Sequence, residues 1–429
     1  MKSAGRVAAA IEVLADVVER NRPVQDALKD WGLAHRFAGS GDRAAIGNLV
    51  FDALRWFMSS AYRMDDESPR AVILATLGYR WAWGPHGLTQ AFQGDKFAPS
   101  ALTDTEMEHL TQDRLPNAPH WVKADIPAWT EDSFKANFDD EWLTEAQALA
   151  ARAPIDLRVN LGKSDREKVI KALHRFSPQP TLLSPMGIRL SPGSGFDRAP
   201  NVLVEAGYQK GWFEVQDEAS QIAALMVYAR PGEQVLDLCA GAGGKTLALS
   251  DAMQNSGQIH AFDSDRQRLA PIHERLKRAG SRNVQVHGSH EDISHLEGKM
   301  DRVLVDAPCT GSGTWRRRPD AKWRLSEQAM EKRLGEQASV LAQGAKFVRK
   351  GGYLLYVTCS VFPEENELQV ASFLEHNKAF ELVSLGEVWE DIIGFGKLQP
   401  WSVDACSVTL TPASTNTDGF YISVMERRR

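Results

Sequence analysis

The segment Val235–Thr246, which reads VLDLCAGAGGKT, decides the fold of this chain. Its pattern predicts a buried strand, a glycine-rich turn and the start of a helix. From about Gly211 onward strands and helices alternate in the same way, which is typical of a parallel α/β sheet. Glycines in such a turn allow the backbone to come close to a bound ligand. We therefore expect a doubly wound α/β domain with a ligand site at this turn.

Two common phosphate-binding motifs do not fit the turn. A Walker A loop requires glycine where Cys239 stands, and a dinucleotide-binding loop requires glycine where Thr246 stands. The next strand ends in Asp263, and a doubly wound sheet uses an acidic residue at this place to bind a ribose. Asp265 fits as the cap of the helix that we expect over residues 266–279, which leaves Asp263 for the ribose. The pattern favours a nucleoside cofactor without a pyrophosphate, and we expect S-adenosylmethionine.

Two cysteines follow two further predicted strands. Residues 306–309 (DAPC) come directly after one apolar strand, and residues 358–360 (TCS) come directly after another. The carboxyl ends of parallel strands meet at one edge of a sheet, where ligands bind. Either cysteine alone is most simply explained as a small buried apolar side chain. The cofactor turn upstream favours the other explanation, in which both thiols face the active site.

The composition limits the classes of protein that need to be considered. The chain has 429 residues, of which 43% are apolar and 25% charged, as in globular proteins of two or three domains. No apolar run approaches the roughly 20 residues that span a membrane. The four cysteines form no CxxC pair, which argues against a zinc site or a disulfide framework and suits a reducing cytoplasm. Because the net charge is −6, any RNA-binding surface must be a local basic patch.

The sequence predicts three domains, and the first is helical. Residues 1–140 carry apolar residues at helical spacing, with Ser68 as one expected helix cap and Thr103 with Glu106 as a capping box. This region contains no catalytic constellation. Its tryptophans are expected in the protein core rather than on an RNA-binding surface. A helical docking domain is all that the pattern supports.

A small α+β domain is expected over residues 141–209, followed by the α/β domain over residues 210–429. The small domain begins with a strand-like alternation, and further short strands follow a helical segment. Its basic residues Arg158, Lys163 and Lys168 admit two interpretations. They either contact phosphate or form a solvated charged face, and the second is the simpler interpretation.

Five sequence blocks carry a resemblance to a known family. The blocks are residues 214–221 (EVQDEASQ), 237–246 (DLCAGAGGKT), 306–309 (DAPC), 358–366 (TCSVFPEEN) and 418–421 (DGFY). On these blocks the α/β domain resembles, almost throughout, the RNA cytosine-C5 methyltransferases of the NusB-fused Sun/Fmu type. The paired Pro-Cys and Thr-Cys motifs are highly specific to that family. The helical region resembles a NusB-like domain more loosely, around residues 39–56.

The resemblance implies a fold and a reaction. The fold is a Rossmann-like S-adenosylmethionine-dependent methyltransferase domain, preceded by an all-α NusB-like RNA-binding domain and a small α+β domain. The reaction is methylation of cytosine C5 in RNA, with ribosomal RNA as the expected substrate. Transfer RNA is the alternative substrate. A weakly active RNA-binding ribosome assembly factor is the alternative class of protein.

The implied chemistry explains why the active site needs two cysteines. Cytosine C5 is a poor nucleophile, and addition of a thiolate at C6 makes the ring an enamine whose C5 can attack a sulfonium methyl group. By resemblance Cys359 is this nucleophile, and Cys309 helps to expel the methylated base by β-elimination. Asp306 holds or protonates the pyrimidine near N3, which offsets the negative charge that addition brings into the ring.

The resemblance also assigns residues to the cofactor. Two places depart from the usual family pattern. Ser289 stands where the family usually has an aspartate near the adenine, and the turn lacks the usual proline before its paired glycines. The cofactor-binding residues are expected to be Cys239, Ala240, Gly241, Ala242, Gly243, Gly244, Lys245, Asp263, Arg268 and Asp306.

A basic segment soon after the first thiol is the expected RNA contact. Arginines beside an aromatic residue suit phosphate contact together with base stacking. A run of solvated surface charge is the alternative, which is weaker here because the loop begins at the active-site edge. We expect RNA as the partner of a monomeric protein, and neither a metal ion nor a membrane. The residues expected to contact RNA are Arg316, Arg317, Arg318 and Lys322.

Overall fold

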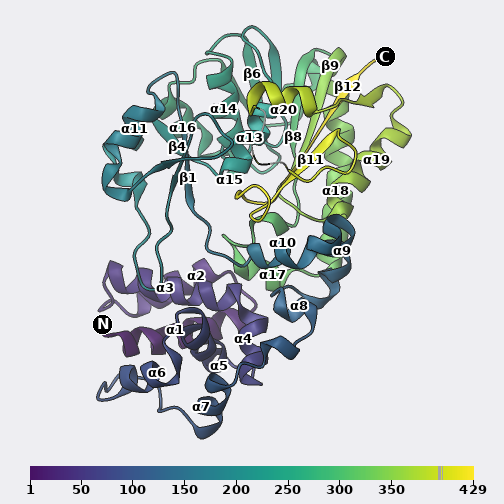
Figure 1. The fold of residues 1–429 in the computed structure, drawn as a ribbon. Coiled ribbons are helices and arrows are strands. Elements are labelled where there is room, and N and C mark those ends of the chain that lie inside the picture. Colours follow the sequence, from purple (N-terminus) through teal and green to yellow (C-terminus); the bar gives the residue numbers. More distant parts are fainter. Residues whose placement is uncertain (395–397, 399) are drawn as a thin grey trace. The chain divides into compact units, whose positions relative to one another are not determined.

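The computed structural model describes residues 1–394, 398 and 400–429, and the chain divides into two compact units. Figure 1 shows helices in the first unit and two sheets with flanking helices in the second. Among the described residues, no helix is long and apolar enough to cross a membrane. The first unit comprises Met1–Ala153, Pro192–Ala199 and Trp315–Leu325, and the second comprises Pro154–Ser191, Pro200–Thr314 and Ser326–Arg429.

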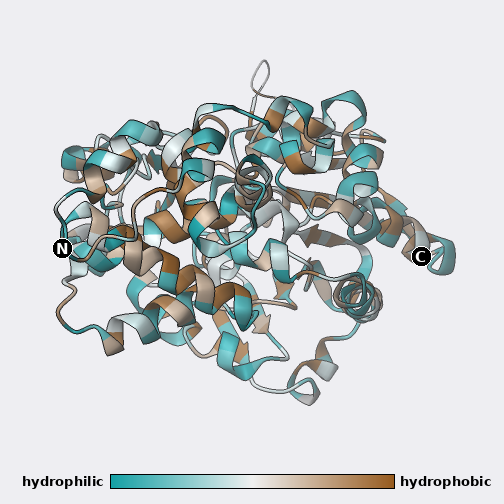
Figure 2. Ribbon diagram, turned by 90° about the horizontal axis from the view of Figure 1, so that it is seen from below, coloured by the Kyte–Doolittle hydropathy of each residue, from teal (hydrophilic) through white to brown (hydrophobic). Residues whose placement is uncertain are grey.

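The first unit is helical because its apolar residues recur on one face of each segment. Side chains such as Val7, Leu14 and Ile46 form its buried core. Figure 2 shows apolar and polar residues together on most helices, as amphipathic helices require. The helices are α1 (Ser3–Glu19), α2 (Val24–Ala34), α3 (Ser40–Arg55), α4 (Phe57–Met64), α5 (Pro69–Ala75), α6 (Gly84–Phe92), α7 (Asp104–Thr111), α8 (His120–Lys123), α9 (Glu131–Phe138), α10 (Trp142–Ala148) and α17 (Pro319–Arg324).

The expected helix caps are confirmed in this unit. The side chain of Ser68 accepts the N–H of Ala71 at the start of α5. Thr103 and Glu106 form a capping box at the start of α7. The helical region continues through α10, and therefore extends past residue 140, where we expected it to end.

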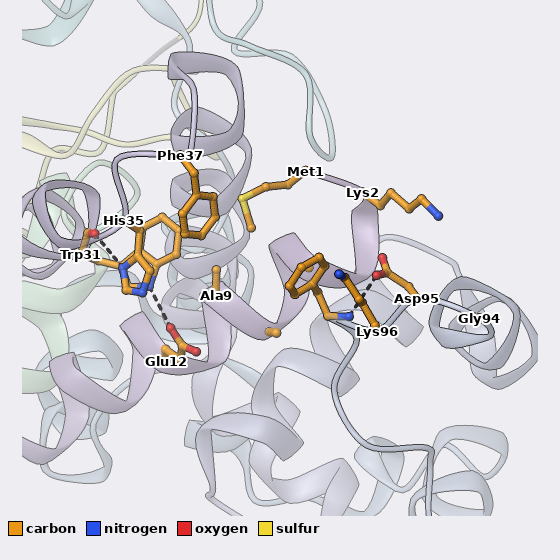
Figure 3. A pocket seen from close by; sticks show the side chains of 13 residues that line it. Met1, Lys2, Ala9, Glu12, Trp31, His35, Phe37, Gly94, Asp95 and Lys96 are labelled. Atoms are coloured by element: carbon orange, nitrogen blue, oxygen red, sulfur yellow. Dashed lines mark hydrogen bonds between the residues drawn. The ribbon is translucent and has the colours of Figure 1, made fainter.

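A pocket of about 930 Å³ lies in the first unit, and aromatic side chains line much of it (Figure 3). The ring of Trp31 stacks on that of His35 with centroids 4.3 Å apart, and its indole N–H donates to Glu12. Trp31 also packs against the apolar core, as do Trp81 and Trp83, which confirms the expectation for these tryptophans. None of the predicted site residues lines this pocket.

A small antiparallel sheet begins the second unit. Its strands lie in the order β2-β3-β1-β4, and β1 pairs with β3 on one side and β4 on the other. Because β4 belongs to this sheet, the small α+β part extends beyond residue 209, the expected boundary. The elements are β1 (Ile155–Val159), α11 (Arg166–Ala172), β2 (Gln179–Pro180), β3 (Gly187–Leu190), α12 (Ala206–Gln209) and β4 (Phe213–Val215).

The remainder of the second unit is the predicted Rossmann-like domain. Its sheet has the strand order β10-β12-β9-β8-β5-β6-β7, and β11 pairs with β12. The pairs from β9 through β8, β5 and β6 to β7 are parallel, and β12 runs antiparallel to β9. The strands are β5 (Gln234–Asp237), β6 (Gln258–Phe262), β7 (Val284–His287), β8 (Met300–Asp306), β9 (Val348–Thr358), β10 (Phe380–Leu382), β11 (Ser407–Leu410) and β12 (Phe420–Arg427).

Helices cover both faces of this sheet, so its central strands are apolar on both sides. Leu304 and Leu355 lie in one buried cluster, whereas their neighbours Val305 and Leu354 lie in another on the opposite face. Figure 1 shows α18 and α19 along one side of β9. The helices are α13 (Glu218–Met226), α14 (Gly244–Ala252), α15 (Arg266–Leu269), α16 (Ile272–Ala279), α18 (Glu327–Phe347), α19 (Glu367–His376) and α20 (Gly386–Ile392).

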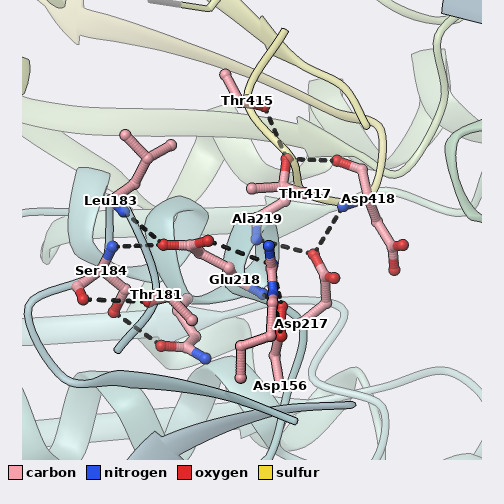
Figure 4. Close-up of polar contacts among 12 residues, drawn as sticks. Asp156, Thr181, Leu183, Ser184, Asp217, Glu218, Ala219, Thr415, Thr417 and Asp418 are labelled. Atoms are coloured by element: carbon pink, nitrogen blue, oxygen red, sulfur yellow. Dashed lines mark hydrogen bonds and ion pairs between the residues drawn. The ribbon is translucent and has the colours of Figure 1, made fainter. Parts of the chain in front are cut away.

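One buried carboxylate joins the small sheet to the Rossmann-like domain (Figure 4). Glu218, at the start of α13, is fully buried and accepts the backbone N–H groups of Leu183 and Ser184 at 2.6 and 2.8 Å. Arg189 of β3 also reaches this carboxylate, at 3.3 Å. The neighbouring Asp217 accepts the N–H of Asp418. The sequence blocks 214–221 and 418–421 therefore have a structural role in holding these segments together.

Removal of this carboxylate should destabilise the second unit. Glu218→Ala leaves two buried N–H groups without their acceptor, so we expect a loss of about 3 kcal/mol in the free energy of unfolding. Urea unfolding would measure it. The matched control is Glu205→Ala, which removes the partner of the largely exposed Arg175 and should cost less than about 1 kcal/mol. Equal losses in the two variants would contradict the assignment.

Candidate active site

The two thiols lie side by side at the carboxyl edge of the parallel sheet. In the pairing of β8 with β9, Asp306 stands opposite Val357, so both strands end at the same level. The loops that follow bring Cys309 and Cys359 together, with 3.4 Å between their Sγ atoms. Both thiols are free and half-buried. The sequence therefore predicted this juxtaposition correctly.

A buried glutamate holds the loop that carries Cys309. Glu365 accepts the backbone N–H of Thr310 at 2.8 Å and the Thr310 hydroxyl at 2.5 Å. The amide of Gln337, on α18, donates to the same carboxylate at 2.9 Å and to the carbonyl of Pro308 at 3.0 Å. Sequence reasoning missed both residues. Glu365 lay within a matched block, whereas a glutamine in the middle of a helix gave no signal.

The loop that carries Cys359 is held by its own set of hydrogen bonds. The carbonyl of Cys359 accepts the N–H of Gly313, and the carbonyl of Gly313 accepts the N–H of Gly419. A Cβ on Gly313 would lie 2.1 Å from the Gly419 carbonyl oxygen, so only glycine fits there. The hydroxyls of Ser360 and Ser312 are 2.9 Å apart. These contacts fix the backbone on both sides of the thiol.

The environment of the Cys309 sulfur favours its protonated form. The hydrogen bond to the Cys359 sulfur, together with burial, raises the pKa of the Cys309 thiol well above its usual value. Cys309 therefore stays protonated at neutral pH, and its S–H can donate to Cys359.

The glycine-rich turn has the shape that a closely bound ligand requires. Gly241 and Gly243 have φ angles of +50° and +82°, which side chains with a Cβ rarely adopt. A Cβ on Gly243 would also lie 2.5 Å from Ile272. The guanidinium of Arg275 donates to the carbonyl of Ala242 at 2.7 Å and fixes the turn from α16. Ala240, on the other side, donates its N–H to the carbonyl of Phe262.

The acidic residue at the end of β6 faces this turn. Asp263 is buried, and its carboxylate accepts the N–H groups of Gly241 and Asp265 at 2.8 Å each. Asp265 caps α15 by accepting the N–H groups of Gln267 and Arg268, as expected. The helix expected over residues 266–279 is broken at Pro271 into α15 and α16. Asp263 is thus oriented toward the turn and is not used as the helix cap.

Charged groups complete the candidate cofactor site. The amine of Lys245 donates to the carboxylate of Asp306 at 2.6 Å and lies 5.1 Å from the ring of Phe420. Asp237 accepts the Thr246 hydroxyl with one oxygen, while its buried Oδ1 has no hydrogen-bond partner among the described residues. An unsatisfied buried oxygen next to a glycine turn fits a ligand that donates a hydrogen bond. These residues fit a nucleoside cofactor with an amino acid portion.

The remaining expected cofactor residues differ in how well they fit. Burial raises the pKa of the Cys239 thiol, which therefore remains neutral. The Arg268 guanidinium is 60% exposed and 4.0 Å from the Asp263 carboxylate, so it lies at the rim of the turn. At the departure from the family pattern, Ser289 donates its backbone N–H to the carboxylate of Asp292 at 3.0 Å. An acidic group is therefore present beside Ser289 after all.

The basic segment expected to contact RNA is packed within the helical unit instead. Arg316 and Lys322 are only 2% exposed. The amine of Lys322 donates to the carbonyl of Arg55, and burial lowers the pKa of Lys322 to about 8. Burial argues against RNA contact by these two residues. At Lys322 the carbonyl of Arg55 and the rings of Trp315 and Trp323 satisfy the cation inside the protein. Arg317 is half-buried and Arg318 exposed, and for them the contact stays a prediction.

Comparison with known families assigns this arrangement of loops. Residues 224–426 match the family described as 16S rRNA methyltransferase RsmB/F, and residues 126–194 match the ferredoxin-like domain of RsmF/B-like methyltransferases. These two regions are similar to the RsmB/F methyltransferases. The small sheet corresponds to the ferredoxin-like part, and the Rossmann-like domain to the methyltransferase part. The helical unit is consistent with the NusB-like domain that we expected.

Curated relatives of the RsmB/F family support the same assignment. Proteins named ribosomal RNA small subunit methyltransferase B are 32% identical over 268 residues in Escherichia coli O6:K15:H31 (strain 536 / UPEC) and 32% identical over 264 residues in Shigella sonnei (strain Ss046). Each alignment covers 61% of this chain and 60% of the relative. The match thus spans about three fifths of the relatives' length.

Solved structures show the same fold. The crystal structure of PH0851 is 25% identical, with a TM-score of 0.73 over 99% of both chains. A methyltransferase homologue from Pyrococcus horikoshii is 26% identical, with a TM-score of 0.59 over 72% of this chain and 97% of its own. NSun6 from Pyrococcus horikoshii, solved with the S-adenosylmethionine analogue SFG, has the same fold at 20% identity and a TM-score of 0.60. The glycine-rich turn of this chain fits S-adenosylmethionine.

The turn should not tolerate a side chain at Gly243. Gly243→Ala combines a positive φ with overlap on Ile272, so we expect it to lower the free energy of unfolding by about 2 to 3 kcal/mol. Gly335→Ala is the control, because Gly335 is exposed within α18 and has open space around it. Alanine there should stabilise by about 0.5 to 1 kcal/mol. Urea unfolding distinguishes the two, and a neutral Gly243→Ala would contradict the strained turn.

The buried carboxyl of Asp237 should make stability depend on pH. Burial raises its pKa from 3.8 to about 7, so folding takes up a proton between these values. The stabilising contribution of this group is complete below pH 4 and is lost as the pH rises through 7. Asp237→Asn does not titrate. The unfolding free energy of the variant minus that of the wild type should therefore rise by up to about 1.4 kcal/mol per pH unit in this interval.

Urea unfolding of both proteins at pH 5 and pH 7 measures this difference. Glu331→Gln is a suitable control, because that carboxylate is exposed on α18. A difference between Asp237→Asn and the wild type that stays constant with pH would contradict a proton held at Asp237.

Proposed function

We propose that this chain is an S-adenosylmethionine-dependent RNA cytosine-C5 methyltransferase that works through a covalent adduct between Cys359 and C6 of cytosine. The observation that carries the proposal is the 3.4 Å separation of the Cys309 and Cys359 sulfur atoms, beside the cofactor turn at one edge of the sheet. Two structural cysteines would not need to meet at the place where a parallel sheet binds its ligands.

In the first step the Cys359 thiolate adds to C6 of the target cytosine. The S–C6 bond forms, the C5=C6 double bond opens, and the electron pair moves through the ring toward N3. C5 then becomes nucleophilic and takes the methyl group. When bound, the cofactor supplies that methyl group on an electron-poor sulfonium. The Cys309 S–H can donate a hydrogen bond to the attacking sulfur.

In the second step Cys309 allows the product to leave. Cys309 passes its proton to the departing sulfur of Cys359 and accepts the proton that C5 loses. The C6–S bond breaks, the electrons of the C5–H bond restore the double bond, and both residues end as thiols. The short distance between the sulfurs makes this exchange possible without a further base.

Asp306 and Lys245 act on the pyrimidine edge in this proposal. The Asp306 side chain is 32% exposed and hydrogen-bonded to the Lys245 amine, so its carboxyl is held in place yet accessible to a base. Addition of the thiolate drives negative charge toward N3. The Lys245 ammonium offsets that charge where it develops, and the paired Asp306 holds the pyrimidine edge. Asp306 also lies next to the turn, within reach of the methionine end of the cofactor.

Ribosomal RNA is the substrate that the comparisons favour. The matched family is described as a 16S rRNA methyltransferase, and the curated relatives are named as ribosomal RNA small subunit methyltransferases. We include an RNA substrate, cytoplasmic location and a monomeric state in the proposal. The four cysteines, all free, suit a compartment that keeps thiols reduced.

The two thiols should respond in opposite ways to substitution. Cys359→Ala should lower methylation by about 1,000-fold or more and form no adduct, because the nucleophile is gone. Cys309→Ala should add to the base and methylate it, but release it slowly. Incubation with labelled RNA and S-adenosylmethionine, followed by a denaturing gel, should show a shifted band for Cys309→Ala. The double variant with Cys359→Ala should lose the band.

Cys406→Ala is the control for this experiment, since Cys406 lies outside the paired loops and should behave as wild type. Wild-type turnover in Cys359→Ala, with no shifted band in Cys309→Ala, would refute the covalent mechanism. Methylated product with the methyl group at a position other than C5 would refute the assigned reaction.

A further inference from the structure

A basic cavity lies in the second unit, at the end of α16. It has a volume of about 440 Å³, and its lining includes Lys163, Lys277 and Arg282 together with the polar residues Asn255 and Ser281. No aspartate or glutamate is among the described residues that line it. The chain has a net charge of −6, whereas the charged residues that line this cavity are all cations. We call it the α16 cavity.

The basic residues around α16 fall into two groups. Arg275 and Arg278 both form ion pairs with the buried Glu214, so these two cations serve the structure. Lys277 and Arg282 form no ion pair with any carboxylate in the part of the chain that the structure describes, and both are exposed. Lys277 and Arg282 thus keep their charge for a ligand, whereas the third cation of the lining, Lys163, donates to backbone carbonyls.

An aromatic residue with two further unpaired lysines continues this surface. The Lys163 amine donates to the carbonyls of Arg278 and Lys210, which places the cavity beside residues 210–212. The amines of Lys168 and Lys210 lie 4.3 and 5.2 Å from the centre of the half-exposed Trp212 ring. Among residues 1–394, 398 and 400–429, neither amine pairs with a carboxylate. Cations that flank an accessible ring suit phosphates next to a stacked base.

We propose that the α16 cavity and the adjoining Trp212 surface bind the sugar-phosphate backbone of the RNA substrate at a distance from the methylated base. This inference rests on the proposed function and adds a second place of contact. Of the three residues for which the sequence left phosphate contact open, it favours that contact for Lys163 and Lys168, whereas Arg158 is buried and donates to Gln216. It also supplies a local basic patch, which the buried Arg316 and Lys322 do not.

The place of the cavity defines what it does for the reaction. Helix α16 starts at Ile272, which touches the cofactor turn, and ends at Ala279, which lines the cavity. Its eight residues span about 12 Å. A group that binds RNA this far from the reacting atoms holds substrate and transition state equally. It therefore lowers KM and leaves kcat unchanged.

The test uses the full-length chain with the substitutions Lys277→Ala and Arg282→Ala together. The probe is a fluorescent, unstructured single-stranded RNA, and binding is followed by anisotropy over a range of salt concentrations. We expect the Kd to rise by about tenfold at 0.15 M salt, and the slope of log Kd against log salt to become shallower by about 1.4, or 0.7 for each lost phosphate contact. In methylation assays KM should rise by a similar factor while kcat stays within about twofold.

The control variant is Lys299→Ala with Lys378→Ala, which removes two exposed charges of the same unit outside the cavity. It should bind RNA as wild type does. Equal Kd values and salt slopes for the two double variants would overturn the proposal. So would tight binding of poly-glutamate that the cavity variant loses while RNA binding persists, because the surface would then serve an acidic protein.

The binding measurement needs no turnover, so the inference and the proposed function fail separately. RNA binding that depends on the cavity, in a protein that methylates no RNA, would refute the proposed function and support the cavity. Methylation of RNA, with equal RNA affinity in both double variants, would support the proposed function and refute the cavity as a binding site.

Discussion

The parallel pairing of β8 with β9 is the constraint on which the active site depends. Because Asp306 and Val357 stand at the same level in the two strands, the loops that follow start side by side. A slip of one residue in this register would turn the apolar side chains of a strand to the opposite face of the sheet. Since both faces are covered by helices, the register is set by burial. The closeness of the two thiols is therefore a consequence of core packing.

Buried carboxylates then organise the loops around that edge. Glu365 holds the Cys309 loop, Asp263 holds the cofactor turn, and Glu218 holds the small sheet. Each accepts backbone N–H groups, which satisfies a charge that would be costly in an apolar interior. Asp237 is the exception, because one of its oxygens has no partner within the described residues. That oxygen lies next to the candidate cofactor site. An unsatisfied buried group, which costs stability, is therefore placed where a bound ligand could satisfy it.

The sequence predicted the parts of the fold that local patterns control. The caps at Ser68 and Thr103, the glycine turn and the two thiol loops follow from residue type and spacing over a few positions. The break of the helix at Pro271 was missed, although proline removes a helix hydrogen bond and is a signal for such a break.

Contacts between distant segments were not accessible in this way. The Lys322 amine is buried against the carbonyl of Arg55 on α3 and the ring of Trp323 on α17, and a charge run alone does not reveal such acceptors. Gln337 holds the Cys309 loop from the middle of a long helix, where its residue type gives no indication of this contact. The predicted residues on the glycine turn and at the strand ends could be placed from sequence because ligands generally bind at such positions in a parallel sheet.

The position of β12 in the sheet has a consequence for synthesis. This strand follows all other strands of the sheet in sequence, yet it pairs directly with β9, and Gly419 just before it bonds to the loop of Gly313. The hydrogen bonding around Cys359 is therefore incomplete on a ribosome-bound chain until β12 has emerged. The arrangement of the two thiol loops thus forms only once the last strand of the sheet has been synthesised.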